Sequence, residues 1–426
     1  MKSGVQNPDV IVVGAGTAGL SAAQSLRAAG LETLVVEAAG HAGGRCFTDT
    51  STFSVPFDRG GSWLHSAAIN PLARLAEAQG VPLHKADWNS TRVQVKGHDL
   101  TAQEVADYGA YGDAMWEAIN RRGGQEPDVS SYAALPDGKW ADTASRWIAQ
   151  MVGGDADVTS ARDSYNYANA QGDWLVAGGL GAFVQRLHRD VPVELNCPVE
   201  KIDYSGPRVR VTTTRGVIEA KHLILTVSTG VLAAERIVFV PPLPSAKQTA
   251  VGGLPNGLLN KIGIEFDPAW QEATEGDAAD YHVGDAEFCT LHFGFFGTSL
   301  AVGFVAGRFA AALEEEGAGA ATDFCLQGLR ATYGSDALKY VRRTDETAWQ
   351  TNDLTVGSYS FARPGQTDAR RVLAEPIADR LFFAGEATMT DTYSTVHGAY
   401  LSGQRSAEQV IAAMQKQAIP ATQPET

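Results

Sequence analysis

The distribution of apolar residues predicts that the chain opens with a strand, a helix and a second strand. Asp9–Val13 and Leu31–Glu37 are short apolar runs of the kind found in buried parallel strands. Between them, apolar residues recur at helical spacing from Leu20 to Gly30, and a glycine commonly follows the end of a helix. This order of elements is typical of a doubly wound parallel sheet.

Further helices and strands are predicted along the rest of the chain. Apolar residues show helical spacing in three segments, Asn70–Gly80, Ala320–Tyr333 and Gly398–Met414. Thr101 and Glu104 form a capping-box pattern that opens a fourth helix toward Ile119. Runs typical of strands lie at Val193–Leu195, Arg208–Thr213, Val217–Ala220, His222–Val227, Lys261–Phe266, Phe288–Phe293 and Arg380–Ala384. We interpret the four runs between residues 193 and 227 as a β-meander that returns to the first domain.

The order of these elements predicts an α/β fold with two domains, each built from separated segments. Residues 1–75, 175–245 and 371–426 are expected to form a discontinuous Rossmann-type domain, with the proline-rich segment Pro241–Pro244 as a boundary. Residues 76–174 and 246–370 are expected to form an α+β domain that combines a mixed sheet with helices. A pocket between the two domains is the natural ligand site.

Composition and charge exclude several classes of protein. With 44% hydrophobic and 19% charged residues, the 426-residue chain is neither disordered, collagen-like nor a coiled coil. A net charge of −15 argues against a nucleic-acid partner and permits a cationic small molecule. The four cysteines are widely separated and lack a C-x-x-C pattern, so neither a disulfide framework nor a metal site is expected.

The apolar segments are short, so we expect neither a membrane span nor a secretory signal. No apolar run reaches about 18 residues. Met1–Pro8 is polar, and Lys416–Thr426 is a polar, proline-containing segment that we expect to be a loose tail. The expected compartment is the cytoplasm.

A glycine motif between the first strand and the first helix predicts a dinucleotide site. In G-x-G-x-x-G, the first glycine allows a tight turn, the second admits a pyrophosphate, and the third lets the helix pack on the strand. Glu37 closes the second strand at about the spacing that suits a ribose hydroxyl, which favours FAD or NAD over NADP. The residues expected to contact the dinucleotide here are Gly14, Gly16, Thr17, Ala18, Gly19, Glu37 and Ala38.

Two further glycine clusters follow, and either alone would be interpreted as a loop. Gly43-Gly44-Arg45 combines a flexible backbone with a guanidinium that can grip a phosphate or form a fixed salt bridge. The second cluster is Gly60-Gly61-Ser62-Trp63-Leu64-His65.

Together with Phe383–Ala387 and Tyr393–Gly403, these motifs resemble the flavin-containing amine oxidase family from end to end and in the family's order. The polyamine oxidase branch and its flavin-dependent histone demethylase relatives are the most similar, through Tyr393–Gly403, Gly357–Ser360 and the W-x-H at 63–65. The resemblance implies an FAD-binding domain and a substrate domain. It also implies hydride transfer from the carbon beside an amine nitrogen to flavin N5, with hydrolysis of the imine to aldehyde and amine. The reduced flavin would then pass its electrons to O2, giving H2O2.

The resemblance also implies roles for individual residues. Lys261 stands where the family places the lysine that holds a water against flavin N5; without the family, it would be interpreted as a surface lysine at the start of a strand. Trp349 matches the flavin-side tryptophan, and Tyr359 matches an aromatic wall beside the amine. Thr395 stands where the family has the second wall, so the cage looks half open unless Tyr393 compensates.

The same resemblance extends to the cofactor contacts and to a pocket histidine. His65 resembles a histidine that hydrogen-bonds a substrate nitrogen. Ser358 stands where monoamine oxidases attach flavin through a cysteine, so the FAD is expected to be noncovalent. The cofactor contacts implied by the resemblance are Gly44, Arg45, Gly61, Ser62, Trp63, Val199, Glu386, Thr395 and Val396.

The substrate implied by the resemblance, by His65 and by the acidic charge is a polyamine, and the expected partners are this small cationic amine and O2. The protein is expected to be a monomer or homodimer. Alternatives are a monoamine, L-amino-acid or alkaloid amine oxidase, a dehydrogenase with another acceptor, a flavin-binding protein without turnover, and a desaturase or isomerase. An amino-acid oxidase would need an arginine for the carboxylate, and the candidates are Arg308, Arg342, Arg343 and Arg363.

Overall fold

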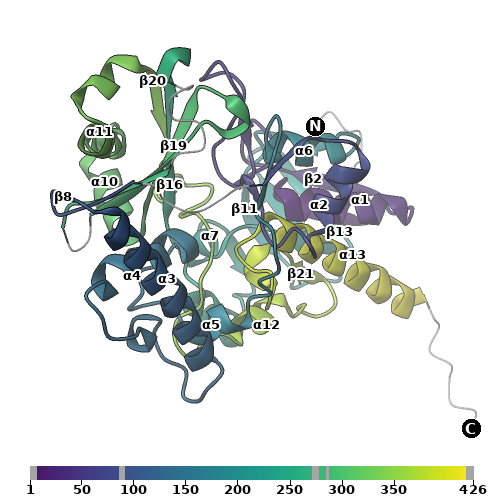
Figure 1. Cartoon of the computed structure of the whole chain (residues 1–426). Coiled ribbons are helices and arrows are strands. Elements are labelled where there is room, and N and C mark those ends of the chain that lie inside the picture. The colour runs from purple at the N-terminus through teal and green to yellow at the C-terminus, as the bar shows by residue number, and fades with distance from the viewer. Residues whose placement is uncertain (1–6, 86–91, 271–277, 285–286, 419–426) are drawn as a thin grey trace, which may run out of the picture.

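A five-stranded parallel sheet forms the centre of the Rossmann-type half of the molecule (Figure 1). The computed structural model describes residues 7–85, 92–270, 278–284 and 287–418. In spatial order, the sheet strands are β10 (Val193–Glu194), β2 (Thr33–Val36), β1 (Val10–Val13), β14 (His222–Leu225) and β21 (Leu381–Phe383). All four strand pairs are parallel, so segments from the beginning, middle and end of the chain share one sheet.

The alternation of side chains along β1 explains the layers on either side of this sheet. Val10 and Val12 pack with helices α1 (Thr17–Ala28) and α13 (Val396–Ala418), which contact each other. Ile11 and Val13 face the opposite core, which contains a second sheet and two helices. These elements are β11 (Val199–Asp203), β12 (Val209–Thr213), β13 (Gly216–Ala220), β15 (Val238–Val240), α8 (Ser245–Gly253) and α12 (Ala369–Ala374).

The expected four-stranded meander between residues 193 and 227 is wrong in its first and last strands. β10 and β14 join the parallel sheet, and only β11, β12 and β13 pair in antiparallel succession. The reason is burial. All four residues of β14 are buried, as a central parallel strand requires, whereas β12 and β13 alternate between buried and exposed positions.

A mixed seven-stranded sheet forms the other half of the molecule. Its strands are β20 (Val341–Glu346), β16 (Leu259–Phe266), β19 (Leu300–Ala306), β18 (Phe288–Phe293), β17 (Ala278–His282), β7 (Arg92–Val95) and β8 (His98–Asp99). β17 and β7 run parallel, and the other pairs are antiparallel. Figure 1 shows α10 (Gly307–Glu316) and α11 (Ala320–Tyr333) beside this sheet, with α3 (Ala102–Gly123), α4 (Ala141–Val152) and α5 (Ala161–Asn166) below it.

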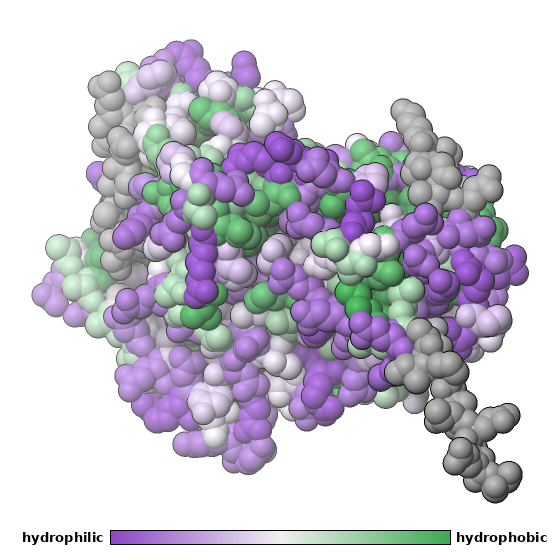
Figure 2. Space-filling view, turned by 90° about the vertical axis from the view of Figure 1, so that its right-hand side faces the viewer, coloured by the Kyte–Doolittle hydropathy of each residue, from purple (hydrophilic) through white to green (hydrophobic). Residues whose placement is uncertain are grey.

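Short elements lie between these larger ones along the chain. They are β3 (Thr48–Asp49), β4 (Phe57–Asp58), β5 (Trp63–Leu64), α2 (Pro71–Ala78), β6 (Leu83–Lys85), η1 (Tyr132–Ala134), β9 (Trp174–Val176), α6 (Leu180–Leu187), α7 (Thr229–Ala233), η2 (Phe295–Gly297), η3 (Ser335–Tyr340) and η4 (Glu386–Thr388). On the face shown in Figure 2, apolar patches appear between mostly hydrophilic residues. None of the helices in the described ranges is both long and apolar enough to cross a membrane.

Several elements form as the sequence predicts. The predicted helix at Ala320–Tyr333 is observed at the same residues, and the helix predicted from Gly398 begins two residues earlier, at Val396. The capping box is present, since the Glu104 amide donates to Thr101 Oγ1 (3.3 Å) and the Thr101 amide donates to Glu104 Oε2 (3.0 Å). The α/β fold with a mixed-sheet second half is confirmed. The exact domain boundaries remain a prediction, and most of Met1–Pro8 and Lys416–Thr426 lies outside the described residues.

A substitution at Gly19 tests how tightly α1 packs against the turn at Gly14. A Cβ added there would lie 1.9 Å from the Gly14 carbonyl oxygen, so Gly19→Ala should destabilise the protein by at least about 2 kcal/mol through overpacking. In α8, the Gly252 position has no atom within 4 Å of an added Cβ, so the control Gly252→Ala should be neutral or stabilising by up to about 1 kcal/mol. Denaturant unfolding of both variants measures the difference, and equal stabilities would contradict the tight contact.

Candidate active site

A single large cavity collects the residues that the sequence singles out. It has a volume of about 1820 Å³, more than the roughly 300–1,000 Å³ of a common small-molecule pocket, and therefore has room for a cofactor and a substrate. The predicted site residues that line it are Gly14, Gly16, Thr17, Ala18, Glu37, Ala38, Gly44, Arg45, Gly61, Ser62, Trp63, His65, Val199, Lys261, Trp349, Tyr359, Glu386, Thr395 and Val396. Gly19 lies outside the lining, because its missing side chain serves the contact with Gly14.

The N-terminus of α1 fits the pyrophosphate of a dinucleotide. Gly16 is the N-cap residue, and no side chain among the described residues caps this helix end. The first-turn N–H groups and the positive end of the helix dipole therefore point to the cavity as an anion site. Gly14 has a φ of +101°, and a Cβ on Gly16 would have only the Gly43 oxygen nearby, at 3.9 Å, so the backbone surface is open to a ligand.

Glu37 is held in the cavity lining by two backbone amides. Its Oε2 accepts a hydrogen bond from the Ala15 amide (2.7 Å), and its Oε1 accepts one from the Ala39 amide (2.8 Å). These contacts fix the carboxylate at the end of β2, where it lines the cavity. Each oxygen keeps a second lone pair, which fits a ribose hydroxyl donor.

Arg45 and Glu386 form an ion pair in the cavity lining, with Glu386 buried and Arg45 half-buried. Arg45 Nη1 donates to Glu386 Oε1 (3.0 Å) and to the Ser358 carbonyl (2.7 Å), so of the two roles expected for Arg45 the structure shows the fixed salt bridge. Glu386 also accepts from Ser360 Oγ (2.7 Å) and from the Ser394 amide (2.9 Å). Burial opposes ionisation of Glu386, but Arg45, Ser360 and Arg370 outweigh it and lower its pKa.

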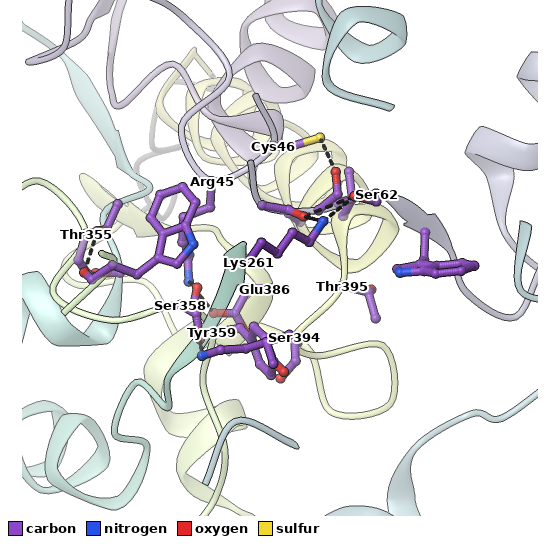
Figure 3. Close-up of a pocket in the computed structure, with 18 of the residues that line it drawn as sticks. Arg45, Cys46, Ser62, Lys261, Thr355, Ser358, Tyr359, Glu386, Ser394 and Thr395 are labelled. Carbon is purple, nitrogen blue, oxygen red and sulfur yellow. Dashed lines mark hydrogen bonds and ion pairs between the residues drawn. The ribbon is translucent and has the colours of Figure 1, made fainter. Parts of the chain in front are cut away.

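Lys261 is buried at the centre of the cavity wall rather than exposed at a strand end. It lies on β16 and is only 5% exposed. Its Nζ donates to the carbonyls of Asp58 (3.0 Å) and Gly60 (2.5 Å) and to Ser62 Oγ. Figure 3 shows the side chain extending toward Ser62, with Tyr359, Glu386 and Thr395 around the same space. Burial lowers its pKa to about 8, against the opposing effect of Asp58.

The aromatic candidates also lie in the cavity wall. Trp349 is buried beside Gly60, since a Cβ on Gly60 would lie 3.2 Å from Trp349 Cζ2. The Tyr359 hydroxyl donates to the Gln150 carbonyl (3.0 Å), which fixes the ring against α4. Burial raises the pKa of Tyr359, so its hydroxyl stays protonated. Thr395 has another task, because its Oγ1 accepts from the Gly398 amide (2.9 Å) at the start of α13. Tyr393 lines the cavity as well.

His65 is held by an aspartate that sequence reasoning missed. Antiparallel pairing of β5 with β9 matches Trp63 with Leu175 and Leu64 with Trp174, which places His65 opposite Asp173. His65 Nδ1 lies 2.8 Å from Asp173 Oδ1. The two residues are 108 positions apart, so no local pattern in the sequence could indicate the pair.

The substrate side of the cavity is acidic. Of the described residues that α3, α4, α5, β7 and β17 contribute to the lining, the charged ones are Asp113 and Asp280. Asp280 is fully buried and accepts from Thr290 Oγ1 (3.1 Å). The four arginines considered for a substrate carboxylate (Arg308, Arg342, Arg343 and Arg363) are all described, and none lines the cavity.

Comparison with known proteins decides the family. The sequence profile of flavin containing amine oxidoreductases matches residues 137–411, and that of an NAD(P)-binding Rossmann-like domain matches residues 12–77. The chain belongs to the flavin-containing amine oxidase family. The resemblance seen in the motifs is thereby confirmed, and the protein is an oxidoreductase of the class that acts on CH–NH groups, with FAD as the cofactor the family implies.

The similar proteins act on different amines, to judge from their names. Polyamine oxidase 2 of Arabidopsis thaliana is 30% identical over 436 residues, covering 95% of this chain and 88% of that protein. Lysine-specific histone demethylase 2 of Homo sapiens is 28% identical over 445 residues, and this chain spans only 54% of its length. The solved structure of wild-type putrescine oxidase bound to putrescine shares the fold, with a TM-score of 0.77, 23% identity and coverage of 95% and 99% of the two chains.

The carboxylate of Glu37 should contribute to holding the cofactor of this amine oxidase. Glu37→Gln removes its negative charge at the ribose position and should weaken FAD retention by about tenfold, the effect of losing a charge-assisted hydrogen bond. Glu32→Gln, an exposed acid next to β2 and outside the cavity lining, is the matched control. Flavin fluorescence after dilution measures FAD release, and equal release from both variants would exclude this role for Glu37.

Proposed function

We propose that this amine oxidase holds FAD noncovalently and oxidises a polyamine, with O2 as electron acceptor. The observation that carries the substrate proposal is the charge of the cavity. The described lining residues of α3, α4, α5, β7 and β17 form its substrate side, which presents Asp113 and Asp280 and no arginine or lysine; the basic lining residues Arg45, Arg59, Arg236 and Lys261 belong to other parts of the cavity. A substrate with several ammonium groups is attracted to such a wall, and a substrate carboxylate is repelled.

The names of similar proteins support this substrate class. The similar sequences include polyamine oxidases, and a structure of the same fold was solved with putrescine.

Different residues around the cavity would serve different parts of the reaction. Bound FAD would accept the hydride from the carbon beside the amine nitrogen and later pass its electrons to O2. Tyr359 supplies an aromatic face against which the amine can be oriented. The acidic residues farther along the cavity attract the remaining ammonium groups. Lys261, whose three ammonium hydrogens are donated to the carbonyls of Asp58 and Gly60 and to Ser62 Oγ, would supply a positive charge at this part of the cavity wall.

The chemistry at Ser358 supports the proposal of noncovalent binding. This hydroxyl donates to the Gly257 carbonyl (3.0 Å) and accepts from the Leu259 amide (2.9 Å), so it is engaged in holding the backbone together. A serine lacks the thiolate nucleophile that a thioether link requires. The ion pair of Arg45 with Glu386 and the open end of α1 supply noncovalent contacts instead.

The substrate proposal predicts a spectral change. Anaerobic addition of spermine, spermidine or putrescine to the purified protein should bleach its yellow flavin band, because the amine reduces the cofactor. Glycerol and L-leucine serve as a non-amine and a carboxylate-bearing control. A yellow protein that is bleached by L-leucine or benzylamine, and by none of the polyamines, would overturn the polyamine assignment.

Lys261 should control the reaction of the amine-reduced enzyme with O2. Because its pKa is about 8, Lys261 is mostly a cation at pH 7 and mostly neutral at pH 9. A cation stabilises negative charge developing on the acceptor, so the reoxidation rate should fall as the pH rises through about 8. Lys261→Met should lower the rate at pH 7 by about tenfold to a hundredfold and abolish this pH dependence.

A second buried lysine provides the control for this experiment. Burial also lowers the pKa of Lys247 to about 8, but Lys247 donates to the carbonyls of Val372 and Leu373 (both 2.7 Å) and lies outside the cavity lining. Lys247→Met should keep the wild-type rate and pH profile of reoxidation. If Lys261→Met behaves in the same way, Lys261 has no part in the reaction.

A further inference from the structure

An ion pair lies fully buried behind one wall of the cavity. Arg370 of α12 has no exposed surface, and Asp163 of α5 is 2% exposed. The pair is bidentate, with Arg370 Nε donating to Asp163 Oδ1 (3.0 Å) and Nη2 to Oδ2 (2.7 Å). Buried charges are costly unless they are paired and hydrogen-bonded, so this arrangement is rare and strongly constrained.

The pair holds Tyr393 in place. The Arg370 guanidinium lies 3.8 Å from the centre of the Tyr393 ring, and the Tyr393 hydroxyl donates to the Asp163 carbonyl (2.5 Å). Tyr167, another lining residue, meets the ring edge-on at 5.5 Å. Tyr393 lines the cavity and Arg370 does not, so the ring separates the buried cation from the ligand space. We call Asp163, Arg370 and Tyr393 the tyrosine clamp.

The clamp is also connected to the cofactor side of the cavity. Arg370 Nη1 donates to Ser360 Oγ (2.9 Å), and that hydroxyl donates to Glu386 Oε2 (2.7 Å). Glu386 is in turn paired with Arg45. Acidic and basic groups therefore alternate from Asp163 on α5, through Arg370 and Glu386, to Arg45 of the G-G-R motif.

The backbone between Tyr393 and Thr395 depends on the same network. Ser394 has a φ of +60°, a left-handed conformation that non-glycine residues seldom adopt. Its amide donates to Glu386 Oε2 (2.9 Å), and its hydroxyl donates to the Ser360 carbonyl. This held turn presents Tyr393 to the cavity while Thr395 caps α13.

We propose that Arg370 and Asp163 are positioning residues that fix two parts of the active site through one buried network. One part is Tyr393, which serves as the second aromatic wall beside the amine in place of Thr395. The other is the Glu386 carboxylate beside the cofactor. The amine half of this inference rests on the proposed function, and the cofactor half does not.

Single substitutions separate the two parts. Tyr393→Leu should raise the dissociation constant of spermidine, measured by anaerobic flavin reduction, by about tenfold and leave FAD retention unchanged. Tyr393→Phe keeps the ring and should bind spermidine within about threefold of wild type. Arg370→Met should weaken both spermidine binding and FAD retention by about tenfold each, because it releases Tyr393 and Glu386 together. Arg371→Met, the exposed neighbour paired with Glu375, is the control and should change neither.

A charge-free double variant distinguishes positioning from mere stability. Arg370→Met alone leaves the Asp163 carboxylate buried and unpaired, which by itself destabilises the fold. The double variant Asp163→Leu with Arg370→Met removes both charges and should fold. If the clamp positions the site, the folded double variant still binds spermidine and retains FAD about tenfold more weakly than wild type. Wild-type values for both would overturn the proposal. If no polyamine reduces the wild-type flavin, the substrate proposal fails, and unchanged FAD retention in the double variant would then refute the clamp.

Discussion

The buried carboxylate of Glu386 is the group on which the geometry of the site depends. It sits just after β21, where it would be unstable as an anion without partners. It accepts hydrogen bonds from Arg45 of the G-G-R motif, from Ser360 in the segment after β20, and from the Ser394 amide before α13. Three separated stretches of chain must therefore meet at one point for the charge to be satisfied, and that point lies at the floor of the cavity.

Arg370 and Lys261 are two further buried charges that need hydrogen-bonding partners, and the kind of partner differs between them. Arg370 is matched by Asp163 and stays ionised, which makes it a fixed cation behind Tyr393. Lys261 has carbonyl and hydroxyl partners rather than a direct carboxylate contact, so burial lowers its pKa to about 8. A group that gains or loses a proton near neutrality is suited to chemistry, whereas a fully paired ion is suited to holding other groups in place. The two charges therefore have different roles, Lys261 in the cavity lining and Arg370 behind it.

The division between cofactor and substrate also follows from the fold. At one end of the cavity, the uncapped N-terminus of α1 presents backbone N–H groups, which suit the pyrophosphate of a dinucleotide whatever the substrate is. The helices α3, α4 and α5 and the strand β17 line the other end with aromatic, amide and acidic side chains. A fold of this kind can serve different substrates, because function depends on the side chains of the site rather than on the fold.

The sequence by itself determined the features that depend on neighbouring residues. The β-α-β unit, the capping box at Thr101, the helix at Ala320–Tyr333 and the glycine motifs could all be predicted, because turn geometry, helix capping and side-chain periodicity act over a few positions. The family resemblance then indicated Lys261, Trp349 and Tyr359, and the structure places all three in one cavity.

Only the tertiary structure decided how distant groups pair. Arg45 and Glu386 are 341 positions apart, and Asp163 and Arg370 are 207 apart, so no local pattern reveals them as partners. The same holds for the strands at Val193 and His222, whose membership of the parallel sheet depends on what covers their two faces. Burial is a property of the assembled chain, and burial gives Lys261, which would be interpreted as a surface lysine without the family resemblance, a pKa of about 8.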